Sequence, residues 1–100
     1  MTLPVVVRVL AEREVDKIVR WHERKRVGLG LRLRRRIDET LLRIEGNPYL
    51  HAATLHGVRH AKTKKFQYVV HYRIRSTYVE IIAILHAKRN STIWKKRDQP

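Results

Sequence analysis

The sequence predicts an α+β domain in which a helix hairpin packs on one face of a mainly antiparallel sheet, in the order β-α-α-β-β-β. Apolar residues recur at helical spacing through most of the first half of the chain and alternate with period two in the second half. The length of 100 residues supports one hydrophobic core, so residues 1–100 are expected to form a single domain.

The first strand and the first helix are predicted from a change of period. The β-branched run from Leu3 to Leu10 predicts a strand, and Pro4 places it at a sheet edge or ahead of the first ladder hydrogen bond. From Ala11 the spacing becomes helical, although no Ser, Thr, Asp or Asn stands there as a cap. The apolar stripe of this helix consists of Ala11, Val15, Ile18, Val19 and His22.

A second helix is predicted from Leu29 to Glu45. Its apolar stripe consists of Leu33, Ile37, Leu41 and Ile44. The sequence Gly46-Asn47-Pro48 ends it, because glycine suits the position after a helix and proline cannot continue one. Since only a short glycine-containing turn separates the helices, they are expected to form an antiparallel hairpin.

Three further strands are predicted after this hairpin. "VRHAK" (58–62) is short and half polar, whereas "FQYVVHYRI" (66–74) alternates clearly between apolar and mixed positions. Residues 75–78 can reverse the chain. "VEIIAIL" (79–85) is apolar on both faces, which is typical of a strand in the middle of a sheet.

The charge of the chain indicates a negatively charged partner. Twenty-three lysines and arginines against nine acidic residues give a formal net charge of +14, more than solubility alone requires. Nucleic acid, the ribosome or an acidic protein would neutralise it. The absence of cysteine excludes disulfides and thiolate zinc sites, and no metal site or cofactor is expected. Short apolar runs and the lack of a signal-like start predict a cytoplasmic protein without a membrane span.

A candidate site follows from the predicted layers, because helices on one sheet face leave the other face free. That face should carry His60 and Lys62 from one strand and His71 and Arg73 from the next, with His86 at the end of the last. Together with Lys88 and Arg89 they would form a basic concavity that binds phosphates. RNA cleavage needs a base, a cation and an acid, which such a group could supply. Alternatively, each histidine is structural or simply exposed.

The C-terminal half resembles a known family. "VRHAKTKKFQYVVHYRI" followed by "YVEIIAILHAKRNSTIW" is similar to the RelE/ParE superfamily, the toxins of type II toxin–antitoxin (plasmid stabilisation) modules. The matching positions are Phe66, Tyr68, Tyr72, His86, Arg89 and Trp94. The first half agrees through its strand, its helices and the Asn47-Pro48 break.

The resemblance implies a small basic toxin neutralised by a cognate acidic antitoxin, with one of two targets. One branch of the superfamily cleaves mRNA on the ribosome, and the ParE-like branch poisons DNA gyrase. The residues that would serve an RNase are His60, Lys62, His71, His86 and Arg89. The residues expected to contact the target or nucleic acid are Lys64, Lys65, Arg73, Lys88, Trp94, Lys95, Lys96 and Arg97.

Two departures from the RNase pattern favour the ParE-like branch. Val69 stands where the RNase branch commonly has arginine, and Trp94, which has no phenolic proton, lies nearest to its C-terminal tyrosine. Trp94 can instead close the edge of the core or stack on a base. The sequence therefore predicts a gyrase-poisoning toxin, with a ribosome-dependent endoribonuclease and a plain nucleic-acid-binding module as alternatives.

Overall fold

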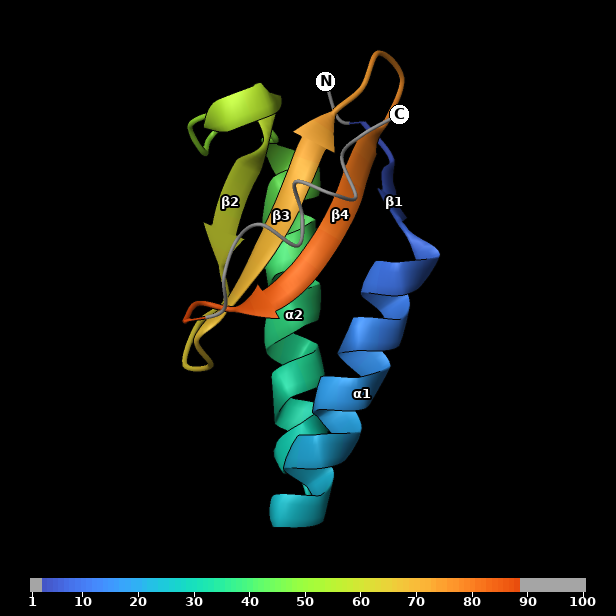
Figure 1. Ribbon diagram of the computed structural model, residues 1–100, viewed down its shortest axis with the longest axis vertical. Coiled ribbons are helices and arrows are strands. Elements are labelled where there is room, and N and C mark those ends of the chain that lie inside the picture. Colours follow the sequence, from blue (N-terminus) through green and yellow to red (C-terminus); the bar gives the residue numbers. More distant parts are fainter. Residues whose placement is uncertain (1–2, 89–100) are drawn as a thin grey trace.

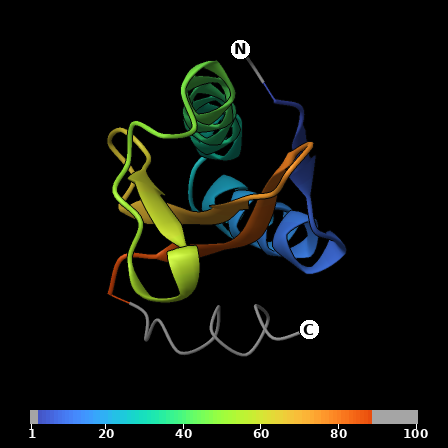
Figure 2. The same ribbon diagram turned by 90° about the horizontal axis from the view of Figure 1, so that it is seen from above.

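A computed structural model describes residues 3–88 and has the predicted order of elements (Figure 1). The elements are β1 (Val5–Val7), α1 (Val9–Lys25), α2 (Leu29–Gly46), the short 3-10 helix η1 (Leu55–Gly57), β2 (Arg59–Lys62), β3 (Tyr68–Ile74) and β4 (Val79–His86). In this part of the chain the strands form one sheet in the order β1-β4-β3-β2, antiparallel except for the parallel pair β1 and β4. Helices α1 and α2 form the predicted hairpin on one face of it (Figure 2).

The first strand is shorter than predicted, and the first helix begins earlier. Pairing with β4 ends at Val7, and the Arg8 N–H then donates to the carbonyl of Ile81 at 3.1 Å. Arg8 is the N-cap of α1, has extended backbone and makes no side-chain cap. Val9, placed in the strand by its β-branched side chain, is helical and 61% exposed. Tertiary pairing with β4, rather than β propensity, therefore sets the end of β1.

The apolar stripes of both helices meet the sheet in one core. Ala11 and Val15 of α1 and Leu33, Ile37 and Ile44 of α2 are buried, as their spacing predicts. They pack on Ala61, Tyr68, Val70, Tyr72, Val79, Ile81 and Ile84 of the sheet. The predicted helix-facing side of the third strand is thereby confirmed.

A buried tyrosine joins the sheet to the segment that follows α2. The Tyr72 hydroxyl donates to the carbonyl oxygen of Pro48 at 2.7 Å, and its side chain is 0% exposed. This contact fixes the segment after α2 against β3. The bridge between Ala53 and Arg59 and the hydrogen bond from Arg73 to the carbonyl of His56 place the loop before β2 beside β2 and β3.

The helix hairpin is closed by glycine and by a carboxylate that the sequence analysis did not anticipate. Gly28 has φ +87°, a left-handed conformation that glycine adopts without steric cost. The Glu23 carboxylate of α1 accepts the N–H groups of Gly28 and Gly30 at 3.0 to 3.1 Å. It thereby satisfies free donors at the N-terminus of α2, where the helix dipole favours a negative charge.

Gly30→Ala is expected to destabilise the protein, because α1 lies close to the backbone of α2 there. A Cβ at position 30 would lie 2.6 Å from the carbonyl oxygen of Val19. Overpacking of this kind costs about 1–3 kcal/mol. That cost outweighs the roughly 1 kcal/mol that alanine gains in helix propensity. Gly46→Ala is the matched control, since a Cβ at position 46 has nothing within 4 Å. Urea denaturation should show a lower midpoint for Gly30→Ala only, and equal midpoints for the two variants would contradict the close approach.

Candidate functional site

The predicted site residues on β2 and β3 share the sheet face that lies opposite the helices. The register pairs His60 with His71 and Lys62 with Val69, so these side chains point to the same side. Arg73 follows two residues after His71 on β3 and lies on the same face. The alternation in the sequence is therefore confirmed for His60, Lys62, His71 and Arg73.

The expectation that this second face lies open to a ligand is wrong. Val58, Ile82, Ala83 and Leu85 form a second apolar cluster there, each 3% exposed or less. His71 is only 6% exposed. A strand that is apolar on both faces, as predicted for residues 79–85, needs cover on both of them.

A β-bulge supplies part of this second cluster. His71 pairs with Ala83 whereas Tyr72 pairs with Ile81, so Ile82 has no partner in the ladder. One extra residue reverses the alternation of side chains along the rest of β4. Ala83 and Leu85 consequently face the second cluster, and Ile84 faces the helices.

The same bulge places His86 away from the other two histidines. His86 pairs with Tyr68, its ring centroid lies 5.4 Å from that of Tyr68, and the Tyr68 hydroxyl lies 3.1 Å from His22 Nε2 on α1. Burial lowers the pKa of His22, and the nearby His86 lowers it further. The expectation that His86 joins His60 and His71 in one concavity is wrong, because the bulge turns His86 to the helix side.

His60 and His71 are joined by a hydrogen-bonded chain that ends on the backbone. Their Nδ1 atoms lie 2.8 Å apart, and His60 Nε2 lies 2.9 Å from the Thr54 hydroxyl. The Thr54 hydroxyl donates to the carbonyl of Val58 at 2.8 Å, because a carbonyl can only accept. Its oxygen therefore accepts a hydrogen bond from His60 Nε2–H, which leaves His60 Nδ1 to accept a hydrogen bond from His71 Nδ1–H. Thr54 could not be predicted from the sequence, because its role depends on the path of the loop before β2.

Both imidazoles are held neutral in this chain of hydrogen bonds. Burial, followed by the neighbouring His60, lowers the pKa of His71 to about 4. Burial also lowers the pKa of His60. Two neutral rings that hydrogen bond to each other give a structural link between β2 and β3, and they are poorly placed to exchange protons with a substrate near neutral pH.

The remaining basic residues of the prediction are dispersed. Lys62 is exposed at the end of β2, and the half-buried Arg73 donates a hydrogen bond to the carbonyl of His56. Lys64 and Lys65 are exposed in the turn between β2 and β3, and Lys88 is exposed just after β4. Arg89, Trp94, Lys95, Lys96 and Arg97 lie outside the described residues.

Within residues 3–88 no three His, Cys, Asp or Glu side chains are grouped so that they could hold a metal ion. Neither α1 nor α2 in that same stretch has the length and apolar character needed to cross a membrane.

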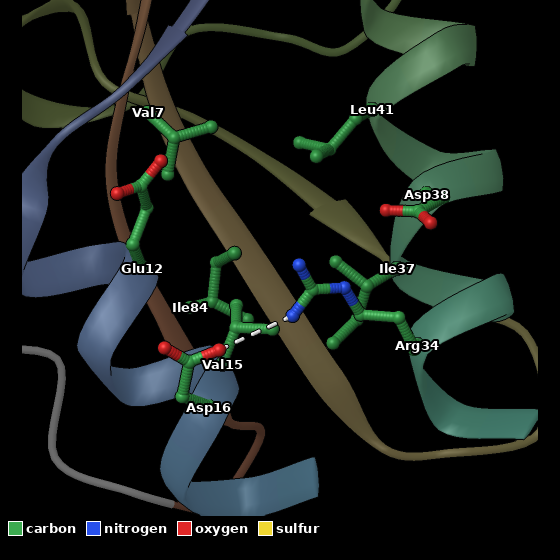
Figure 3. Close-up of a pocket in the computed structure, with 9 residues that line it drawn as sticks. All are labelled: Val7, Glu12, Val15, Asp16, Arg34, Ile37, Asp38, Leu41 and Ile84. Atoms are coloured by element: carbon green, nitrogen blue, oxygen red, sulfur yellow. Dashed lines mark hydrogen bonds and ion pairs between the residues drawn. The ribbon is translucent and has the colours of Figure 1, made fainter. Parts of the chain in front are cut away.

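A pocket that the sequence did not predict lies between α1, α2 and the sheet (Figure 3). It measures about 270 Å³, and its apolar wall consists of Val7, Val15, Ile37, Leu41 and Ile84. Glu12, Asp16 and Asp38 line it as well, and Arg34 reaches Asp16 at 3.4 Å. An apolar wall with carboxylates beside it suits an aliphatic or cationic side chain from a partner.

Comparison with known proteins identifies the family. Residues 5–91 match the family model of the ParE toxin of the type II toxin–antitoxin system, parDE. The chain belongs to the ParE toxin family. The resemblance to the RelE/ParE superfamily is thus confirmed, and the protein is the toxin of a type II toxin–antitoxin module.

The fold agrees with that of a solved structure. A chain described as the chromosomal ParDE TA system from P. aeruginosa matches with a TM-score of 0.74 and 16% sequence identity. The match covers 87% of this ParE-family chain and 98% of the other. No curated protein matches the sequence. The likeness to the solved structure shows the α+β fold in the order β-α-α-β-β-β.

Proposed function

We propose that this ParE-family toxin stops growth by binding and poisoning DNA gyrase in the cytoplasm, without cleaving RNA. The observation that carries the proposal is the arrangement of the histidines. His71 is 6% exposed and bound to His60, and His86 lies on the opposite side of the sheet. A pair of groups that could take and give protons around one scissile phosphate is therefore not assembled from these residues.

The exposed residues favour binding over catalysis for the same reason. Lys62 can attract a phosphate, but its neighbour across the ladder is the apolar Val69, where the RNase branch of the superfamily commonly has arginine. A cation without a nearby proton donor and acceptor can attract a negatively charged target without cutting it. The net charge of +14 then serves to hold the toxin on its target.

A cognate antitoxin would neutralise the toxin by covering its helix hairpin. Leu10, Trp21, Leu31 and Leu42 of α1 and α2 are between 49% and 66% exposed. These side chains and the pocket between α1 and α2 offer apolar surface that a partner segment can bury. The surplus of positive charge elsewhere on the toxin suits an acidic antitoxin.

The proposal is tested by measuring both activities on the same preparation. Purified toxin should inhibit supercoiling by gyrase and stabilise cleaved DNA, and it should leave transcripts intact in a translation extract. Lys62→Ala should inhibit gyrase within about twofold of the wild type, because an exposed cation of this kind contributes little to a large interface. A thermal melt of each variant checks that it is folded.

Two results would count against gyrase poisoning. Cleavage of transcripts by a toxin that leaves gyrase activity normal would favour the ribosome-dependent endoribonuclease, provided that Lys62→Ala no longer cleaves them. Folded toxin that affects neither gyrase nor transcripts, and is harmless to cells without an antitoxin, would favour a plain nucleic-acid-binding module.

A further inference from the structure

We propose that a groove between α2 and the turn joining β2 to β3 binds the phosphodiester backbone of nucleic acid. This α2–turn groove measures about 420 Å³ and is lined by Arg32, Arg35, Arg36, Lys65, Leu29 and Phe66, with Glu39 beside Arg36. The turn lies beside α2 in both views of the fold (Figures 1 and 2). The inference goes beyond gyrase poisoning and does not depend on it.

The groove concentrates positive charge with little to neutralise it. Arg32 and Arg36 stand at i,i+4 on α2, and Arg35 lies between them in sequence. Like charges at this spacing destabilise a helix. Glu39 is engaged with Arg36 at 3.2 Å. Throughout residues 3–88, no ion pair involves Arg32, Arg35 or Lys65. Their charges are therefore available to an anion.

The turn is held in a conformation that brings lysine to the groove. Lys65 has φ +68°, a left-handed backbone that costs a residue other than glycine about 1–2 kcal/mol. The Thr63 hydroxyl donates to the carbonyl of Phe66, and the Phe66 N–H donates to the carbonyl of Lys64 at 2.8 Å. These bonds maintain the strained turn, and strain of this kind concentrates at functional sites. Here the strained residue is a cation that lines the same groove as three arginines.

The lining favours nucleic acid over an acidic peptide. Three of the four cations are arginines, whose planar guanidinium groups bind phosphate oxygens in pairs. The apolar part of the lining is limited to Leu29 and Phe66, which is little surface for a peptide to bury. Phe66 is half-buried, packs against the core and lies T-shaped to His22 at 5.5 Å between ring centroids, so only its exposed part can contact a base.

The test compares two variants that each replace one arginine and one lysine. Arg35→Gln/Lys65→Gln alters the groove, whereas Arg13→Gln/Lys17→Gln removes the same charge from exposed positions on α1. Fluorescence anisotropy would measure the Kd of labelled 12-nucleotide RNA, single-stranded DNA and duplex DNA over a range of salt. The groove variant should weaken binding about tenfold near physiological salt. For single strands, the plot of the logarithm of the binding constant against the logarithm of the salt concentration should also become shallower. The slope should change by about 1.4, the value for two lost phosphate contacts.

The control variant should change the Kd by less than about twofold. An equal loss in both variants would overturn the proposal, because net charge alone would then explain binding. A polyglutamate peptide provides a second test. The proposal would be overturned if this peptide displaced RNA at an equal concentration of negative charge and if its own binding were weakened in the Arg35→Gln/Lys65→Gln variant as much as that of RNA. Gyrase inhibition is measured on the groove variant as well, so that a failure of nucleic-acid binding in the groove can be told apart from a failure of gyrase poisoning.

Discussion

Glu80→Ala is expected to lower the free energy of unfolding by about 3 kcal/mol. This value is near the low end of the range for removing one partner of a buried ion pair, because both arginines that bind Glu80 reach solvent. Glu80 is 8% exposed. Its two carboxylate oxygens accept from Arg8 Nε at 2.8 Å and from an Arg75 terminal nitrogen at 3.0 Å. One side chain thus joins the start of α1 to the turn between β3 and β4. Alanine would remove this shared partner from both guanidinium groups.

Two further variants separate the charge of Glu80 from its packing. Glu80→Gln preserves the shape and should lose about 1–2 kcal/mol, since an amide oxygen still accepts one hydrogen bond. Glu39→Ala removes a side chain that is 49% exposed and paired with Arg36 at i,i+3, so its loss should stay below about 1 kcal/mol. Urea denaturation at neutral pH measures all three, and equal losses for Glu80→Ala and Glu39→Ala would refute a special role for Glu80.

The sign of the pH effect at Glu80 follows from its partners. Burial acts to raise the pKa of this carboxyl, but the hydrogen bonds and charges of Arg8 and Arg75 outweigh it and hold the pKa below the ordinary 4.5. The unfolded chain therefore takes up this proton first as the pH falls. The contribution of Glu80 is complete above about pH 4.5 and is lost as the pH falls through the lower folded pKa.

Acidification to pH 4 is expected to cost the folded state about 3 kcal/mol through His71 alone. Its pKa is about 4 in the folded protein against 6.5 for an unperturbed histidine. Below pH 6.5 the unfolded chain binds the proton and the folded chain does not, so each pH unit lowers stability by about 1.4 kcal/mol. The loss levels off near pH 4, where folded His71 is protonated as well.

The histidine effect is measured by urea denaturation between pH 7.5 and 4.5. In His71→Gln the side-chain amide can still donate to His60 Nδ1, so the variant should fold and lose more than half of the pH dependence. Part of the dependence should remain, because burial lowers the pKa of His60 too. His56→Asn changes an exposed histidine outside this chain of hydrogen bonds and should keep the wild-type slope. An unchanged slope in His71→Gln would show that His71 is not the group that titrates.

Much of the fold could be predicted because the relevant signals are local. Leu33, Ile37 and Ile44 are buried because their spacing matches the helical repeat. Tyr68, Val70 and Tyr72 face the helices because side chains alternate along a strand. Element ends were less predictable: the strand predicted at Leu3–Leu10 is Val5–Val7, since its length depends on pairing with β4 some 70 residues later.

The sequence by itself determined the order of elements, the helix hairpin, the sharing of a face by His60 and His71, the basic charge and the family resemblance. Only the tertiary structure decided that His60 and His71 bind each other, that His71 is buried, that His86 turns to the helices and that Lys65 lines a groove with arginines of α2. The reason is physical. Periodicity records which face a side chain prefers, whereas one unpaired residue, Ile82, reverses the alternation in β4. Register and turn geometry, which form between distant segments, set which polar groups meet.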